Sequence, residues 1–216
     1  NLEIIKNGVS SSYFHTRRTA KELNAQNTHH ELFGWGENFG GIGTNLKLQS
    51  GFKSLEEMIS EVKNGIYINE FWYCRVLDPI TQVVTGLNRN GSFLIENGKI
   101  VKPIGRLRFT QSFISSLAQG NVLNIGNNSR YADSEFGEGI LNVPAIHLKE
   151  FNFKKNNNFL GINKFKIICH IIGLTSITLL SDKNSFKYFL ISHQLVKSGV
   201  PKFIIKTPVL PNFTSG

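Results

Sequence analysis

The amino-acid sequence predicts an α+β fold that is rich in strands, with an antiparallel meander or barrel-like sheet and two or three short helices. Three observations support this fold class. Runs of β-branched and aromatic residues recur over residues 66–101, Asn-Gly dipeptides stand where hairpin turns are expected, and residues 54–65 carry the clearest helical period. The chain has 216 residues and is 40% apolar, which is enough for one sizeable core.

The first elements expected are two strands, at residues 2–5 and 9–14, because Asn7-Gly8 between them is a strong hairpin signal. Residues 16–23 are expected to form a short helix with Thr16 as its cap.

A long loop is expected next, over residues 24–51. This stretch is rich in Gly, Asn, Thr and His and has no sustained period. Long loops within domains are often functional. Residues 45–48 are expected to form a short strand that leaves the loop.

The clearest helix is expected at residues 54–65. Ser54 and Glu57 have the spacing of a capping box, in which each side chain binds a backbone N–H at the helix start. Gly65 is expected to end the helix in a left-handed conformation. One apolar stripe follows the helical period: Leu55, Met58, Ile59 and Val62.

Four strands are expected in the next segment, separated by turn signals. They lie at residues 66–77, 82–87, 92–96 and 99–101, with turns at Asp78-Pro79, Asn90-Gly91 and Asn97-Gly98.

The remaining elements of the body alternate between helix and strand. We expect a second helix at residues 109–117, a strand at 121–125, a polar loop at 131–139 and a last strand at 140–153. Gly120 is expected to stop the helix, and Pro144 predicts an edge or a bulge in the last strand.

Composition divides the chain into a body at residues 1–153 and a basic apolar extension at residues 154–216. Residues 1–150 hold 15 Lys and Arg against 14 Asp and Glu, whereas residues 151–216 hold 9 against 1. The nearly neutral body argues against nucleic acid as the main partner, although a basic segment can bind it. Two alternatives remain for the extension. In the first, it adds strands to the fold at residues 165–171, 186–191 and 203–205. In the second, which we favour, it is an appended segment of poor foldability.

Cysteine use and hydropathy indicate a cytoplasmic protein. Cys74 and Cys169 are too few for a disulfide framework, which favours a reducing compartment. The longest apolar run, residues 167–180, is shorter than the roughly 20 residues of a membrane span, and the first residues lack the pattern of a signal peptide. Because the chain begins without Met, we expect a fragment or a processed product.

The residues favour no catalytic or metal-binding group within the chain. His30-Glu31 would begin a zinc helix of the type His-Glu-x-x-x-His, but the closing position is Trp35, so His29 and His30 are interpreted as exposed loop residues. Cys74 is interpreted as a buried strand residue. Adjacent strand residues point to opposite faces, which argues against metal binding by Cys169 and His170. His15 and His147 are interpreted as structural histidines with satisfied hydrogen bonds.

One polar loop is a candidate for a substrate groove or a subunit interface, with a solvated turn as the alternative. It clusters one basic and two acidic groups before the last expected strand. Together with one residue of the long loop, the candidate groove or interface residues are Asn45, Arg130, Tyr131, Asp133 and Glu135.

An ordered series of short motifs over residues 1–153 resembles the C-terminal domain of the TldD/PmbA metallopeptidase family, whose members are also called modulators of DNA gyrase. The series runs Arg17-Arg18-Thr-Ala20, Thr44-Asn45-Leu-Lys-Leu, Gly51, Ser54-Leu-Glu-Glu-Met-Ile, Gly65-Ile-Tyr-Ile, Phe71-Trp72-Tyr73, Asp78-Pro79, Thr85-Gly86-Leu, Asn90-Gly91-Ser-Phe-Leu-Ile-Glu-Asn-Gly98, Leu107-Arg-Phe, Asp133-Ser-Glu135-Phe-Gly137 and Val143-Pro144-Ala. Each motif alone is short, and the specificity lies in their order.

The resemblance implies a barrel-like C-terminal domain of a two-domain zinc peptidase (a hydrolase) that cleaves unfolded or small peptides as a homo- or heterodimer. Zinc is the implied cofactor, held by a His-Glu-x-x-x-His helix and a cysteine near the end of the C-terminal domain. That helix would lie upstream of residue 1, and residues 131–153 contain no cysteine. We therefore expect the chain to be inactive in proteolysis by itself. The alternatives are a non-catalytic partner or scaffold subunit and a DNA-associated modulator.

Overall fold

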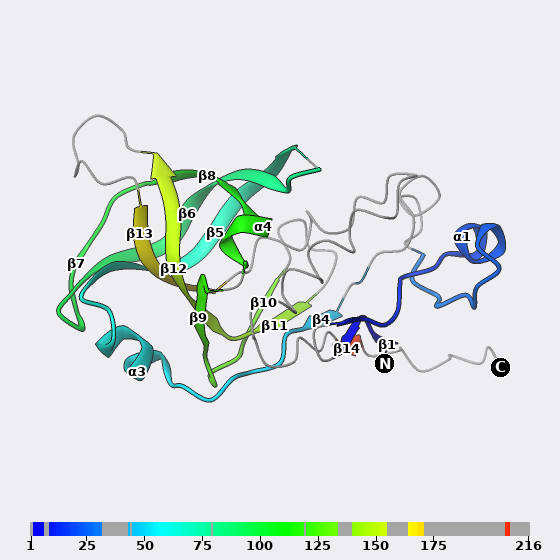
Figure 1. The fold of residues 1–216 in the computed structure, drawn as a ribbon, viewed down its shortest axis with the longest axis horizontal. Helices are drawn as coiled ribbons and strands as arrows, with labels where there is room; N and C mark the ends of the chain where they lie inside the picture. The colour runs from blue at the N-terminus through cyan, green and yellow to red at the C-terminus, as the bar shows by residue number, and fades with distance from the viewer. Residues whose placement is uncertain are drawn as a thin grey trace.

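The centre of the computed structural model is a closed barrel of five strands in the order β13-β5-β6-β8-β12, in which β12 pairs back with β13 (Figure 1). The structure describes residues 2–6, 9–31, 43, 45–78, 80–118, 120–133, 140–154, 164–170 and 206–207. The barrel strands are β5 Asn64–Asp78, β6 Val83–Glu96, β8 Arg108–Ser112, β12 Ala145–Lys154 and β13 Lys164–His170. The expected strand-rich α+β fold is confirmed.

Aromatic rings fill the interior of the barrel. The centroids of the Phe71 and Phe109 rings are 4.7 Å apart, and the Phe151 centroid is 5.3 Å from Phe71 and 5.4 Å from Phe109. Phe113 and Phe153 extend this cluster. These rings come from strands β5, β8 and β12 and from the helix after β8, so side chains far apart in the sequence build one core.

The hairpin of β5 and β6 is longer than expected, because Asn90-Gly91 is not a turn. Ile68 pairs with Ser92 and Glu70 pairs with Arg89, which leaves one extra residue on β6. Asn90 and Gly91 have φ angles of 54° and 100°, and they form a bulge within one continuous strand. The prediction of two strands here was wrong.

The turn expected at Asn97-Gly98 is confirmed. Their φ angles are 50° and 77°, as a two-residue hairpin turn requires, and Glu96 pairs with Lys99 across the turn. The strand that follows, β7 Lys99–Pro103, pairs with β6 outside the five-stranded ring.

The prediction of a helix at residues 109–117 was wrong for the first half of this segment. Residues 108–112 form β8, and only α4 Phe113–Ser116 is helical. Phe109 and Gln111 are both buried, so the segment alternates with the period of a strand. The expected strand after it is confirmed as β9 Val122–Ile125, which pairs with β12.

The first short helix keeps its predicted cap. In α1 Arg17–Glu22, the Thr16 side chain accepts a hydrogen bond from the Thr19 backbone N–H. The N-terminal hairpin is also confirmed, since β2 Ile5–Lys6 pairs with β3 Val9–Ser10. Asn7 and Gly8 lie outside the described residues, and β1 Leu2–Glu3 pairs with β14 Lys206–Thr207.

The predicted capping box is present in α3 Leu55–Ser60, where Glu57 N–H donates to Ser54 Oγ and Ser54 N–H donates to the Glu57 carboxylate. The predicted stop at Gly65 was wrong, because the helix ends at Ser60 and Gly65 lies in β5. A Cβ at Gly65 would lie 2.6 Å from the Lys166 carbonyl oxygen, so close strand packing explains this glycine.

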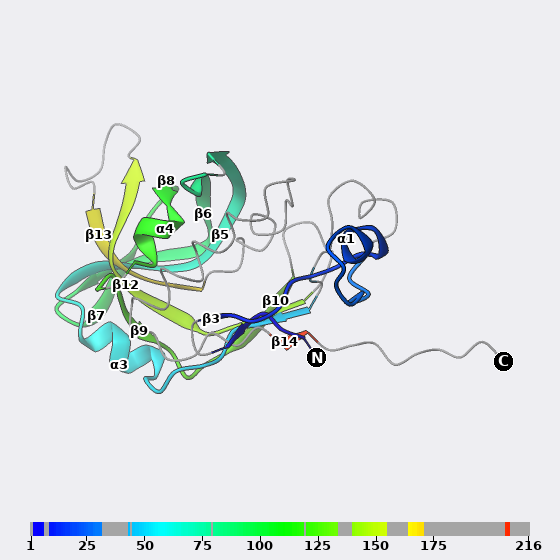
Figure 2. The same ribbon diagram turned by 45° about the vertical axis from the view of Figure 1, so that its right-hand side comes forward.

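A second sheet of three strands lies between the barrel and α1 (Figures 1 and 2). Its order is β10-β11-β4, with β10 Arg130–Asp133 antiparallel to β11 Ile140–Val143 and β4 Asn45–Lys47 parallel to β11. Two expectations are corrected here. The loop predicted at residues 131–139 begins as a strand, and the strand predicted at residues 140–153 is split at Pro144 between the two sheets. Proline has no N–H to donate, which suits this break.

The strand expected at residues 165–171 is confirmed as β13, which lies between β5 and β12 in the barrel. The strands expected at residues 186–191 and 203–205 lie outside the described residues. The division of the chain at residue 153 stays a prediction.

Candidate functional site

Four of the five candidate groove or interface residues meet in the three-stranded sheet. Asn45 of β4 pairs with Ile140 of β11, and Ile140 pairs with Asp133 of β10. Two positions along the strands, Lys47 and Tyr131 pair with Asn142 from its two sides. Glu135 lies outside the described residues. The fold therefore joins the end of the expected long loop to the polar segment that precedes the last strands.

The two faces of this sheet differ in character. Leu46, Leu141 and Ala132 pack against the barrel core. Tyr131 is on the opposite face and is 78% exposed. Since successive strand residues alternate, the same face positions as that of Tyr131 are occupied by Asn45, Lys47, Asp133, exposed Ile140 and Asn142, the last of which is buried. We call this group, with Tyr131, the outer face of the three-stranded sheet.

Arg130 is separated from the outer face, although it adjoins Tyr131 in the sequence. Its Nη1 donates to Asn69 Oδ1 at 2.7 Å and its Nη2 donates to the Asn69 carbonyl oxygen at 2.6 Å. Asn69 Oδ1 also accepts from the Tyr67 hydroxyl at 3.3 Å. Arg130 therefore links β10 to β5, and its buried Nε has no hydrogen-bond partner. Burial raises the pKa of Tyr67, while the charge of Arg130 opposes the shift.

Sequence reasoning missed Lys47 and Asn142 as members of the outer face. Neither stands in a polar cluster. Finding them would have required the two-residue period along each strand together with the pairing of the three strands, which sequence alone does not supply.

The N-terminal histidines do not form a zinc helix, because residues 25–31 have no regular secondary structure. His29 is exposed as expected. His30 is half-buried, which corrects the prediction. Its ring lies 4.6 Å from that of Phe14, Nδ1 is 3.0 Å from Thr28 Oγ1, and burial lowers its pKa.

His147 departs from the prediction of a satisfied structural histidine. Its side chain is 2% exposed, yet neither Nδ1 nor Nε2 has a hydrogen-bond partner. Burial, the largest cause, lowers its pKa to about 4; Glu61 opposes the shift, and Lys166 and Lys53 add to it.

The two cysteines are buried, as expected for Cys74. Burial raises the pKa of Cys169, so this thiol is protonated at neutral pH. Within the described ranges, no group of three or more His, Cys, Asp or Glu side chains is arranged to hold a metal ion. No helix in those ranges is long and apolar enough to span a bilayer.

A polar pocket of about 440 Å³ lies between α4 and β12. Its amides bind the protein itself: Gln111 Oε1 accepts from the Asn152 side chain at 2.6 Å, and Asn121 Nδ2 donates to the Ser116 carbonyl at 2.8 Å. The pocket lining is therefore largely a structural network.

Comparison with known proteins finds a family match that covers most of the chain. Residues 1–155 match the family model described as the PmbA/TldA metallopeptidase C-terminal domain. A metalloprotease of Methanothermobacter thermautotrophicus is 25% identical over 147 residues, which cover 66% of this chain and 30% of that protein.

Solved structures share the fold. TldE from Thermococcus kodakarensis aligns with a TM-score of 0.53 and 18% identity, over 77% of this chain and 33% of its own. A proposed modulator of DNA gyrase from Thermotoga maritima aligns with a TM-score of 0.51 and 17% identity, over 76% of this chain and 32% of its own. The chain thus spans about a third of the length of these relatives.

Proposed function

The chain belongs to the PmbA/TldA (TldD/PmbA) metallopeptidase family through that family's C-terminal domain, and from this premise we propose that it is the C-terminal part of a zinc peptidase acting on unfolded or small peptides. The family match over residues 1–155 supports the proposal. It also confirms the family resemblance carried by the ordered motifs.

The outer face of the three-stranded sheet is the part that we propose contacts the peptide or the partner subunit. One observation carries this assignment: pairing of β4, β11 and β10 brings Asn45, Asp133 and exposed Tyr131 from distant segments onto one face. Asparagine side chains can bind peptide amides, and an exposed tyrosine supplies an apolar surface with a polar tip. Arg130 supports this face from behind through Asn69.

The described residues do not fit a zinc site, so no chemical step is assigned to them. The sequence also lacks His-Glu-x-x-x-His, since Trp35 stands at the closing position after His30-Glu31. In the proposed peptidase the metal ligands are supplied by an upstream segment of the same polypeptide. The intact mass of the native protein tests this arrangement, and we expect a value well above 24.3 kDa.

A peptide-cleavage assay tests the role of the outer face in that native protein. Tyr131→Ala should lower kcat/KM for an unfolded peptide by about tenfold, the loss of roughly 1.4 kcal/mol of binding. The matched control is Phe52→Ala, which removes another exposed aromatic ring, one that lies outside the sheet and is 88% exposed. The control should leave kcat/KM unchanged, and chelation of zinc should abolish cleavage in both variants.

Equal effects of the two substitutions would reject the outer face as a contact surface. Zinc-dependent cleavage by the purified 216-residue chain would reject the upstream metal site.

The second candidate is a non-catalytic subunit that completes the groove of an active partner. A parent gene that lacks His-Glu-x-x-x-His upstream of residue 1 would favour it, whereas the motif there would favour the first candidate. A native mass near 24.3 kDa, with cleavage only in the presence of a second family subunit, would support this candidate over the first.

A further inference from the structure

The feature that the proposed function leaves unexplained is the buried imidazole of His147. This residue is the third of β12, where its neighbours in register are Asn124 of β9 and Ile168 of β13. The adjacent residues Ile146 and Leu148 face the barrel interior, so His147 faces outward. It is nevertheless 2% exposed, which means that other elements cover it.

The cover on this side of the barrel is α3 together with the residues that precede it. Below α3 lies a small apolar cluster that is separate from the barrel interior and consists of Met58, Val62, Ile95, Ala145 and Ile168. Because the two clusters are distinct, α3 can leave the barrel wall without opening the aromatic core.

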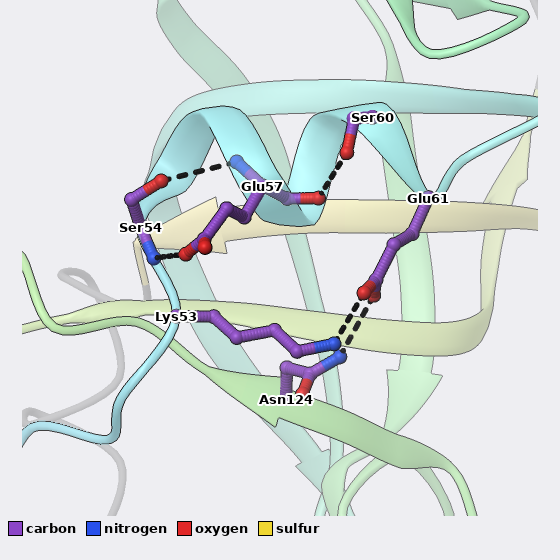
Figure 3. Close-up of polar contacts among 6 residues, drawn as sticks. All are labelled: Lys53, Ser54, Glu57, Ser60, Glu61 and Asn124. Carbon is purple, nitrogen blue, oxygen red and sulfur yellow. Dashed lines mark hydrogen bonds and ion pairs between the residues drawn. The ribbon is translucent and has the colours of Figure 1, made fainter.

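Polar contacts hold this cover in place. Lys53 forms an ion pair with Glu61 just after α3, and Asn124 Nδ2 donates to the same carboxylate at 3.2 Å (Figure 3). Asn127 N–H donates to the Lys53 carbonyl oxygen at 2.7 Å, and Gly51 N–H donates to the Gly126 carbonyl oxygen at 2.8 Å. We call these four contacts the clasp.

A proton on the buried ring would meet an unfavourable environment. Three charged groups act on His147: Glu61 beside α3 favours the proton, whereas Lys166 of β13 and Lys53 before α3 oppose it. Glu61, the favourable one, already binds Lys53 and Asn124 in the clasp. An imidazolium here has no hydrogen-bond acceptor for either N–H, which is costly inside a protein.

We propose that His147 is a proton-sensitive latch, whose neutral ring keeps α3 and residues 51–53 docked on β9 and β12 and whose protonation releases them while the barrel stays closed. The ring takes its proton from solvent, and release exposes the imidazolium to water and to Glu61. Residues 48–53 connect α3 to the three-stranded sheet, where Leu48 N–H donates to the Asn142 carbonyl oxygen at 3.0 Å. Release therefore loosens a direct connection to the outer face, and the latch stands independently of the proposed peptidase activity.

Amide hydrogen exchange in the 216-residue chain tests the latch, with rates corrected for the intrinsic effect of pH. From pH 6.5 to pH 5, protection of the Val62 and Asn127 amides should fall about tenfold, as linkage to a buried neutral histidine requires. Protection of the Phe109 amide in the barrel should not change over this range.

Three variants sharpen the test. His147→Met and His147→Gln, two neutral replacements, should each abolish the acid-dependent loss of protection. Glu61→Gln removes the anion that favours the proton in the docked state, so the loss should become larger and continue to lower pH before it levels off. The control His30→Gln changes a half-buried histidine away from α3 and should behave like the unmodified chain.

Three results would overturn the latch. Protection of Val62 and Asn127 that is constant down to pH 4 would do so. A parallel loss at Phe109 would show global unfolding, and persistence of the acid step in both His147 variants would assign it to another group.

Discussion

Adjacent residues of one strand have different roles in this protein, as Arg130 and Tyr131 show. In the sequence they belong to one polar cluster, which predicted a common groove. The strand alternation of β10 separates them, so that Tyr131 faces solvent and Arg130 binds Asn69 across the seam between the two sheets. Residue type alone could not show this difference, because it depends on which side of β10 the barrel lies.

Replacing Arg130 should therefore affect stability. Arg130→Ala should lower the free energy of unfolding by about 2 kcal/mol, because hydrogen bonds to charged groups contribute roughly 1.5–3 kcal/mol. Arg130→Lys should recover only part of this loss, since lysine does not reproduce the two-pronged contact with Asn69. Urea unfolding measures the changes, with Arg106→Ala, at an exposed arginine, as the control. Equal costs for Arg130→Ala and Arg106→Ala would contradict the seam contact.

At the scale of single elements, sequence signals succeeded where the responsible groups are neighbours in the chain. The caps at Thr16 and Ser54 and the turn at Asn97-Gly98 are local, and all three are present. Asn90-Gly91 has the same local signal, but it forms a bulge because β5 continues to pair with β6 on both sides of it. The end of α3 and the strand at β8 were missed for a similar reason, since burial against the barrel overrides local preference there.

The capping box of α3 has a measurable energetic role. Ser54→Ala should reduce the free energy of unfolding by about 1 kcal/mol, because it leaves the Glu57 backbone N–H without its acceptor. Glu57→Ala should have a similar effect through the Ser54 N–H. Thermal unfolding compares these variants with Glu56→Ala, which removes an acidic group from the same first turn but not from the box. If Glu56→Ala is as costly, the helix dipole and not the box accounts for the effect.

The bulge in β6 depends on a glycine, whereas another glycine of the same region is dispensable. Gly91 has a φ of 100°, and an added Cβ would lie 3.1 Å from the Phe93 ring. Gly91→Ala should therefore cost about 1–2 kcal/mol of stability. Gly105 has no atom within 4 Å of an added Cβ and no left-handed φ, so Gly105→Ala should be nearly neutral. Chemical denaturation of both variants checks the difference, and a neutral Gly91→Ala would argue against a strained bulge.

For the whole molecule, the main difference between sequence and structure concerns the closure of the barrel. The basic composition after Phe153 favoured an appended segment of poor foldability, yet β13 from that segment lies between β5 and β12. Its pairing with β5 is parallel and spans about a hundred residues of chain, and no local signal encodes a contact of that kind. The fold class was predictable from strand patterns, whereas the element that closes the sheet was not.

The importance of β13 can be tested without shortening the chain. Ile167 is fully buried in the barrel core, so Ile167→Asn leaves an unsatisfied amide there and should cost more than about 3 kcal/mol. Lys166→Asn changes the neighbouring residue, which is half-buried on the outer side, and should cost less than about 1 kcal/mol. Thermal unfolding followed by circular dichroism should show a cooperative transition that falls by many degrees, or disappears, only in the first variant. Similar transitions in both variants would mean that residues 1–153 form the stable unit without β13, as the change in composition predicts.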